Sequence, residues 1–257
     1  MIEFINVSKI YPDGHQAVKD ISFTVKEGEI FVLIGPSGCG KTTTLKIINR
    51  LIEPTSGRIL IQEMDINNYN PIVLRRNIGY VIQEIGLFPH LTVGENIGLV
   101  PHLKKWTKTD KKKRISDLLK MIGLEPDIFI NKYPMQLSGG QKQRIGVARA
   151  LAADPQIVLM DEPFGALDPI TKEQLQDEFL KLQRKLQKTV VFVTHDIMEA
   201  IKLGDRLAIM RNGTTVQIDS PVNIINNSAD DFVRRFLGEH RFQTDGNTIR
   251  MEKTITK

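Results

Sequence analysis

Residues 35–43 have the types and spacing of a loop that binds phosphate groups. Their sequence, GPSGCGKTT, fits the pattern G-x-x-x-x-G-K-[ST], whose glycines let backbone N–H groups turn toward phosphate oxygens. In this pattern Lys41 reaches the β- and γ-phosphates, and the hydroxyl of Thr42 is placed to ligate Mg²⁺. We therefore predict a nucleoside triphosphate site lined by Gly35, Pro36, Ser37, Gly38, Cys39, Gly40, Lys41, Thr42 and Thr43.

Two adjacent carboxylates, Asp161 and Glu162, follow the apolar run IVLM. Buried acids cost free energy unless they are paired or bind a metal. Asp161 is thus a candidate to hold Mg²⁺ through water, and Glu162 is a candidate to polarise the water that attacks the γ-phosphate. Without other motifs, two acids after a strand would be interpreted as a solvated turn. Because the chain also has the phosphate-binding loop, we favour the catalytic interpretation.

Four short apolar runs must position these groups. Each is apolar almost throughout, which is typical of parallel strands covered on both faces, and helical patterns separate them, so we predict an α/β fold. The runs are 29–34, 78–82, 156–160 and 189–194. Gln83 and His195 follow the second and fourth runs. Each is a weak signal alone, but ligands bind beyond the carboxyl ends of parallel strands, so both become site candidates.

A second glycine motif, LSGGQ, occupies residues 137–141. A helical pattern follows it, with Ile145 and Ala148 on the apolar face, so Ser138, Gly139 and Gly140 lie at a helix N-terminus. Such a terminus attracts anions through free N–H groups and a dipole charge of about +0.5. The motif follows no strand, and helical patterns over about 87–153 separate it from the first loop. We infer that the two loops of one chain serve different phosphates.

The basic run KKWTKTDKKKR, residues 104–114, carries most of the visible excess of positive charge. Its second half is predicted to open a helix near Asp110 that ends at Gly123, because Ile115, Leu118, Leu119 and Ile122 share one face. A solvated helix face is the favoured interpretation. A nucleic-acid patch is the alternative, but Trp106 is the only aromatic residue in the run, so a row of base-stacking side chains is missing.

Composition narrows the class of protein. The chain has 257 residues, 41% of them hydrophobic, which suffices for a sizeable core. We expect a cytoplasmic protein, because the N-terminus lacks the pattern of a signal peptide and no apolar run approaches ~20 residues. One cysteine agrees with a reducing compartment. The net charge of +5 indicates anionic neighbours, either nucleic acid or a membrane surface.

The motifs together, in this order along nearly the whole chain, resemble the ATP-binding subunits of ABC transporters. They are Tyr11, GPSGCGKTT, Gln83, LSGGQKQR, IVLMDEP, GALD and THD. The resemblance implies a P-loop NTPase core with a mainly parallel sheet, an N-terminal antiparallel β portion and an inserted helical subdomain. It also implies a head-to-tail homodimer, in which Ser138, Gly139, Gly140 and Gln141 of one copy cover the ATP held by the other.

The resemblance implies roles for single residues as well. Tyr11 would stack on adenine, although an ordinary core aromatic is the alternative. Gln83 would sense Mg²⁺ and the attacking water, and with Thr42 and Asp161 it would form the metal site. His195 would hold the γ-phosphate, and Asp168 would link the two ATP sites across the dimer.

A finer resemblance is to importers of quaternary amines such as glycine betaine, carnitine and choline. It rests on the stretches 48–59, 78–97, 100–106 and 193–213. We expect an ATP-binding domain over 1–240, with its helical subdomain at about 87–153, and a C-terminal tail over 241–257. Many members carry a pair of CBS modules after the ATPase, and we expect none here. Another betaine-like substrate, such as ergothioneine, stays open.

These resemblances imply partners. We expect two transmembrane permease subunits, an external solute-binding protein and a peripheral position on the cytoplasmic face of the membrane. The segment LFPHLTVGEN, residues 87–96, is the expected docking surface, and plain core packing would explain its apolar residues equally. One alternative is a soluble ABC-type ATPase acting on nucleic acid or ribosomes, which usually fuses two ATPase units or inserts coiled coils. A second alternative is an ABC importer for a different solute. A third is a simple kinase, but a kinase would not need the LSGGQ motif.

Overall fold

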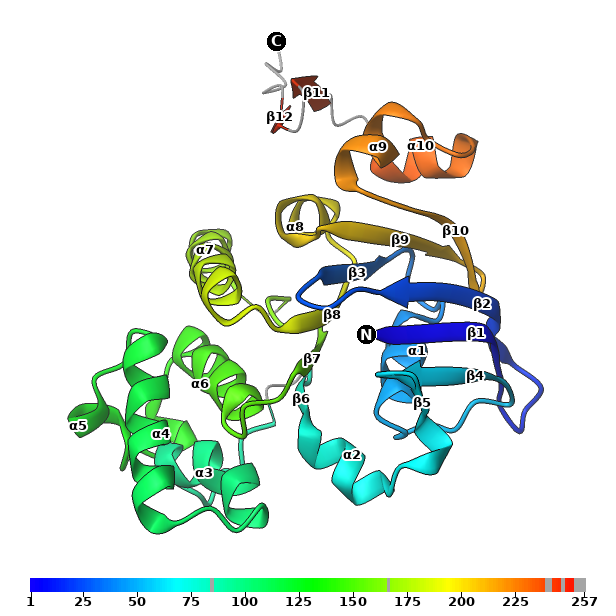
Figure 1. The fold of residues 1–257 in the computed structure, drawn as a ribbon. Coiled ribbons are helices and arrows are strands. Elements are labelled where there is room, and N and C mark those ends of the chain that lie inside the picture. The colour runs from blue at the N-terminus through cyan, green and yellow to red at the C-terminus, as the bar shows by residue number, and fades with distance from the viewer. Residues whose placement is uncertain (84–85, 166, 239–241, 246–247, 252–257) are drawn as a thin grey trace. The chain divides into compact units, whose positions relative to one another are not determined.

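The computed structural model describes residues 1–83, 86–165, 167–238, 242–245 and 248–251 (Figure 1). The chain divides into two compact units. The first joins Met1–Met64 to Phe192–Lys257, and the second is Asp65–Val191. The predicted domain bounds stay a prediction.

The first unit contains an antiparallel sheet and the strand that precedes the phosphate-binding motif. Its elements are β1 (Ile2–Ile10), β2 (Gln16–Val25), β3 (Ile30–Ile34), α1 (Lys41–Ile48), β4 (Ser56–Ile61), α8 (Ile197–Leu203), β9 (Arg206–Arg211), β10 (Thr214–Asp219), α9 (Pro221–Asn226), α10 (Asp231–Leu237), β11 (Phe242–Asp245) and β12 (Thr248–Met251). β5 (Met64–Asp65) and β8 (Thr189–Thr194) span the divisions between the units. β1 pairs antiparallel with both β2 and β4, as the predicted N-terminal β portion requires.

Apolar residues fix the register of this unit. Phe23 of β2 stacks on Phe4 of β1 at 4.3 Å between ring centroids, and on Phe31 of β3 at 5.0 Å. All five residues of β3 are buried, because β3 lies inside a sheet and pairs in parallel with β9. β9 then turns into β10 through Asn212 and Gly213, both with positive φ, a conformation that tight hairpins favour.

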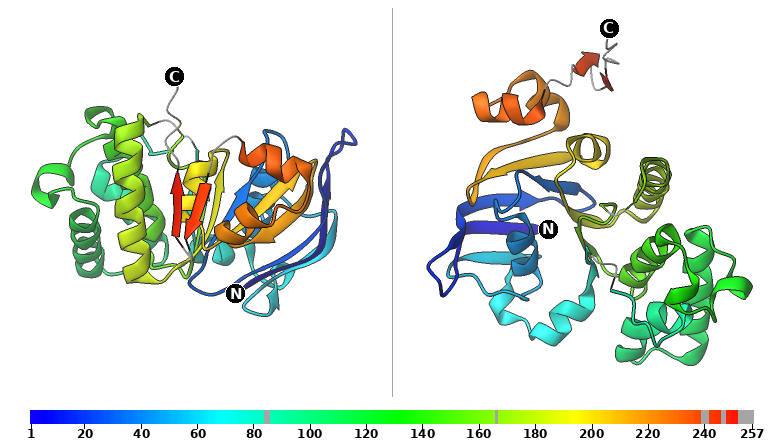
Figure 2. Two further views of the ribbon diagram at one scale, coloured as in Figure 1. Left: turned by 90° about the horizontal axis from the view of Figure 1, so that it is seen from above. Right: turned by 180° about the vertical axis from the view of Figure 1, so that it is seen from behind.

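The second unit combines a parallel strand pair with a group of helices. Its elements are the 3₁₀ helix η1 (Ile66–Asn68), α2 (Pro71–Asn77), β6 (Ile78–Val81), α3 (Val93–Leu103), α4 (Lys108–Met121), α5 (Pro126–Phe129), the 3₁₀ helix η2 (Pro134–Gln136), α6 (Gly139–Leu151), β7 (Ile157–Asp161) and α7 (Pro169–Leu186). β6 and β7 run parallel. Helices α3 to α6, in green tones, gather in one bundle in Figure 1 and in the right-hand view of Figure 2. The predicted α/β class is confirmed.

Helix α4 begins earlier than the sequence predicts. It starts at Lys108 rather than at Asp110, because the Thr107 hydroxyl accepts a hydrogen bond from the Asp110 N–H at 3.1 Å. The same hydroxyl donates to the Asp110 carboxylate at 2.7 Å, so Asp110 belongs to the first turn. The predicted apolar face is correct, since Ile115, Leu118, Leu119 and Ile122 are buried.

Among the residues that the structure describes, no helix is both long enough and apolar enough to cross a membrane.

Candidate functional site

The phosphate-binding motif forms the connection between β3 and α1 in the first unit. Two of its glycines are required by close backbone approaches. A Cβ on Gly35 would lie 2.2 Å from the Met210 carbonyl oxygen, and one on Gly40 would lie 2.4 Å from the Ala17 carbonyl oxygen. Gly40 also has a φ of 104°, which other residues rarely adopt. The loop is therefore seated directly on β2 and β9.

Lys41 places its ammonium group inside this loop. The side chain is 6% exposed, and Nζ donates hydrogen bonds to the carbonyl oxygens of Gly35 at 2.7 Å and Pro36 at 3.0 Å. Cys39 lies beside it, with Sγ 3.8 Å from Nζ. Burial raises the pKa of the Cys39 thiol, and the nearby Lys41 charge only partly opposes this rise. The loop thus holds a fixed positive charge and a thiol that stays protonated.

Tyr11 lies next to the end of the same loop. Its hydroxyl oxygen is 3.4 Å from the Thr43 hydroxyl, and its ring is parallel to the His15 ring at 6.4 Å between centroids. Lys9 Nζ lies 5.5 Å from the Tyr11 ring centroid. Tyr11 is partly exposed. Its predicted contact with adenine stays a prediction.

His195 directly follows β8 and is exposed. The residues on either side of it hold the turn. The Thr194 hydroxyl accepts the N–H of Asp196 at 3.0 Å, and the Asp196 carboxylate caps α8 by accepting the N–H groups of Met198 and Glu199. The backbone that carries His195 is therefore fixed at both sides.

Gln83, Asp161 and Glu162 gather in the second unit. Gln83 Nε2 donates a hydrogen bond to Glu162 Oε2 at 3.1 Å, although 79 positions separate the two residues. Asp161 is the last residue of β7 and is 4% exposed. Glu162 has a φ of 45°, a left-handed conformation that costs of order 1 kcal/mol in a residue with a side chain. Backbone strain is common where a side chain must be aimed, as the predicted base must be.

Tyr80, on β6, has a hydroxyl group whose pKa is affected by Asp161. Burial raises the pKa of the Tyr80 hydroxyl far above its usual value, and the charge of Asp161 raises it further. The Tyr80 phenol therefore stays neutral beside Asp161.

The second glycine motif begins α6, as the sequence predicts. The Ser138 hydroxyl accepts the Gln141 N–H at 3.3 Å, and Gln141 Oε1 accepts the Ser138 N–H at 3.0 Å. This reciprocal cap fixes the first turn. A Cβ on Gly139 would meet no atom within 4 Å, so the turn is open on that side.

Asp168 caps the neighbouring helix α7. Its carboxylate accepts the N–H of Thr171 at 3.0 Å, and hydrogen bonds from Thr171 lower the pKa of Asp168. Thr171 also approaches the glycine motif, because a Cβ on Gly140 would lie 3.1 Å from Thr171 Cγ2. Thr171 is therefore hydrogen-bonded to Asp168 and also lies next to Gly140 of the glycine motif.

Asn96 organises the segment 87–96, a role that the sequence analysis missed. It is fully buried, and its Oδ1 accepts the Phe88 N–H at 2.8 Å. Its Nδ2 donates to the carbonyl oxygens of Phe88, Leu91 and Thr92 at 3.2, 3.0 and 2.9 Å. The sequence holds one signal for this role: a polar residue, Asn96, lies beside the apolar residues Val93 and Ile97 in a helical pattern.

Arg149 is the other residue that the sequence analysis missed. It donates from α6 to the Gly86 carbonyl oxygen, and burial lowers the pKa of its guanidinium. It therefore links the helix that LSGGQ begins to the chain just beyond Gln83. The spacing of residues along the sequence does not predict this contact.

The predicted magnesium ligands are oxygen donors: the hydroxyl of Thr42, the amide of Gln83 and the carboxylate of Asp161. Their chemistry fits Mg²⁺, which prefers hard oxygen ligands and keeps several waters. Within the described part of the chain no cluster of three or more His, Cys, Asp or Glu side chains forms a metal site by itself. A metal at these residues thus stays a prediction.

Comparisons with known proteins now define the class. A family model described as ABC transporter matches residues 18–165, more than half of the chain. The glycine betaine/carnitine/choline transport ATP-binding protein OpuCA of Bacillus subtilis is 54% identical over 258 residues, covering 100% of this chain and 68% of that protein. The osmoprotectant import ATP-binding protein OsmV of Salmonella typhimurium is 55% identical over 245 residues, covering 94% of this chain and 64% of that protein.

A solved structure of an ABC transporter cassette is also similar to this chain. The dimeric structure of MJ0796, a bacterial ABC transporter cassette, matches with a TM-score of 0.77 and 40% identity, covering 86% of this chain and 99% of that one. The chain belongs to the ABC transporter family, and the predicted fold and ATPase class are confirmed. It spans about two thirds of the length of the two transport proteins.

Proposed function

We propose that this chain is the ATP-hydrolysing subunit of an importer for a quaternary amine of the betaine type. One observation carries the proposal: relatives that are 54–56% identical over 94–100% of this chain are named for glycine betaine, carnitine, choline or osmoprotectant transport. These names favour the importer over a soluble ATPase that acts on nucleic acid or ribosomes.

In this proposal the first unit binds ATP. The N–H groups of residues 35–43 face the phosphates, and Lys41 supplies the charge that it already holds inside the loop. The partly exposed Tyr11 stacks its ring on adenine, and His195 donates to the γ-phosphate. Thr42, Gln83 and Asp161 would hold Mg²⁺, which when bound neutralises charge on the β- and γ-phosphates.

Glu162 polarises the attacking water. The hydrogen bond from Gln83 orients the Glu162 carboxylate, and the backbone of Glu162 is left-handed, with a φ of 45°. A carboxylate in this position accepts a proton from water as the water oxygen bonds to the γ-phosphorus, and the bond from that phosphorus to the bridging oxygen breaks, so that ADP leaves. Gln83 therefore joins the base to the segment that follows it, residues 87–96.

Two copies of the chain share each ATP. The first turn of α6 carries Ser138, Gly139 and Gly140, is fixed by its own cap and is open above Gly139. Its N–H groups suit a γ-phosphate held by the P-loop of the other copy. Asp168, close to this turn through Thr171, is placed to link the two sites. The dimeric cassette among the structural relatives supports this arrangement.

The permease subunits dock on the second unit. Phe88 is 43% exposed, although Asn96 holds its backbone rigidly. It lines a hollow of about 310 Å³ together with Tyr80, Leu99 and Arg149. Side chains of a permease would dock on this mixed apolar and basic surface, and the chain would then lie on the cytoplasmic face of the membrane. An external solute-binding protein would deliver the amine.

Uptake tests the proposal directly. The chain is expressed in a bacterium whose glycine betaine importer keeps its permease and solute-binding protein but lacks its own ATP-binding subunit. Uptake of labelled glycine betaine, carnitine or choline is expected, and Lys41→Ala should abolish it. Uptake of none of these amines, with the complex assembled in the membrane, would contradict the assigned substrate class.

A further inference from the structure

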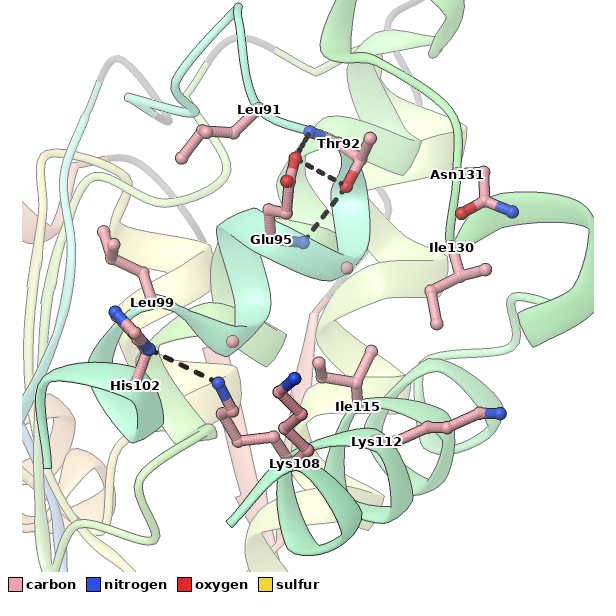
Figure 3. Close-up of a pocket in the computed structure, with 13 residues that line it drawn as sticks. Leu91, Thr92, Glu95, Leu99, His102, Lys108, Lys112, Ile115, Ile130 and Asn131 are labelled. Atoms are coloured by element: carbon pink, nitrogen blue, oxygen red, sulfur yellow. Dashed lines mark hydrogen bonds between the residues drawn. The ribbon is translucent and has the colours of Figure 1, made fainter. Parts of the chain in front are cut away.

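A cavity of about 610 Å³ lies between α3 and α4, away from all the residues assigned above to ATP (Figure 3). Its apolar lining includes Leu91, Leu99, Ile115 and Ile130. Two glycines of α3 face the same side. A Cβ on Gly94 would lie 2.8 Å from Ile130 Cγ1, and one on Gly98 would lie 3.1 Å from Ile115 Cδ1. The side chains of Ile130 and Ile115 therefore pack directly against these glycines, and all four residues line the cavity.

The polar lining of this cavity is basic. His102 comes from α3, and Lys108, Lys111 and Lys112 come from α4. Lys111 Nζ lies 3.3 Å from His102 Nδ1, which Figure 3 marks with a dashed line from His102. In the chain as far as the structure describes it, none of the three lysines forms an ion pair with a carboxylate.

Glu95 is the acidic residue of the lining, and it is already engaged. Its Oε2 accepts the Thr92 N–H at 2.8 Å and the Thr92 hydroxyl at 3.0 Å. These hydrogen bonds lower the pKa of Glu95. The lining of the cavity thus combines lysine ammonium groups with apolar side chains. The Glu95 carboxylate is hydrogen-bonded to Thr92 at the start of its own helix.

Helix stability does not explain where the lysines lie. Lys108 and Lys111 belong to the first turns of α4, where the helix dipole already contributes about +0.5 charge and disfavours cations. Asp110, the acid of the first turn, is hydrogen-bonded to Thr107 and lines a different hollow. The cavity side of the α4 N-terminus is therefore a concentrated positive site.

We propose that this cavity binds a small anion with an apolar body, such as an aromatic or branched-chain carboxylate, sulfonate or phosphate ester. The volume lies within the range of about 300–1,000 Å³ that is typical of small-molecule sites. The apolar body rests on Leu99, Ile115 and Ile130, and the anionic group meets the lysine ammonium groups. The site lies in the helical bundle and requires neither ATP nor the proposed transport function.

Fluorescence titration of the full chain tests this site. The probe is 8-anilinonaphthalene-1-sulfonate, and N-phenyl-1-naphthylamine serves as a neutral probe with nearly the same apolar body. The double variant Lys111→Gln, Lys112→Gln should bind the sulfonate about tenfold more weakly, because charge-assisted contacts are lost. It should bind the neutral probe as the wild type does.

Lys113→Gln is the matched control, since Lys113 is an exposed lysine of the same helix that does not line the cavity. It removes one charge and should leave the affinity for the sulfonate unchanged. Thermal unfolding should show all variants folded, with the sulfonate raising the Tm of the wild type more than that of the double variant. Equal loss in Lys113→Gln, no loss in the double variant, or equal affinity for both probes would each overturn the proposal.

Discussion

At the scale of single residues, the site depends on how Glu162 is held. Gln83 donates to its carboxylate, and its own backbone is left-handed. Glu162→Gln keeps the shape and removes the base, so ATP binding should persist while hydrolysis falls by roughly 10²-fold or more. Nucleotide binding and phosphate release measured on the same sample check this, and turnover near the wild-type rate would rule out Glu162 as the base.

Cys39 gives a prediction about pH. The thiolate is the reactive form, and burial raises the pKa of this thiol. The folded protein therefore holds less thiolate than a free cysteine at neutral pH, and the thiolate fraction grows only as the pH rises toward the raised pKa. Alkylation by iodoacetamide should be slower than for a small thiol at pH 7.5 and should accelerate at higher pH. Mg·ATP should slow it further, and rapid alkylation at pH 7.5 would contradict the buried position.

At the scale of elements, Asn96 holds the segment 88–92 to α3 with four hydrogen bonds. Asn96→Ala leaves these buried backbone groups without their partner, so the free energy of unfolding should fall by about 2–4 kcal/mol. Urea unfolding measures this. Asn131→Ala, at an exposed position, is the control and should change stability by less than about 0.5 kcal/mol.

The elements also show what sequence can predict. The four apolar runs match β3, β6, β7 and β8 to within one residue at each end, because burial on both faces gives strands a strong signal. The meeting of Gln83 with Glu162 follows from the shared edge of parallel strands. The start of α4 was misplaced because both Thr107 and Asp110 are good capping residues, and only the structure shows which one caps. Arg149 contacts Gly86 across 63 positions, and no pattern of spacing encodes that.

At the scale of the whole molecule, the central claim is that the two glycine motifs of one chain act at two different ATP molecules. The P-loop with Lys41 belongs to one compact unit of the chain, and the motif at Ser138 belongs to the other. Each is rigidly built: the loop on β2 and β9, the motif by its own cap. The claim therefore requires a second copy of the chain at each site.

Dimers of two distinguishable chains test this claim most directly. Lys41→Ala and Ser138→Arg are placed either in opposite chains or in the same chain, and both ATP hydrolysis and trapping of labelled nucleotide are measured. Arginine is chosen because its bulk obstructs the N–H groups at the start of α6. Sites shared between copies predict more hydrolysis and trapping with the changes in opposite chains, since one composite site then carries both defects and the other is intact. Greater hydrolysis and trapping with both changes in the same chain would contradict the account.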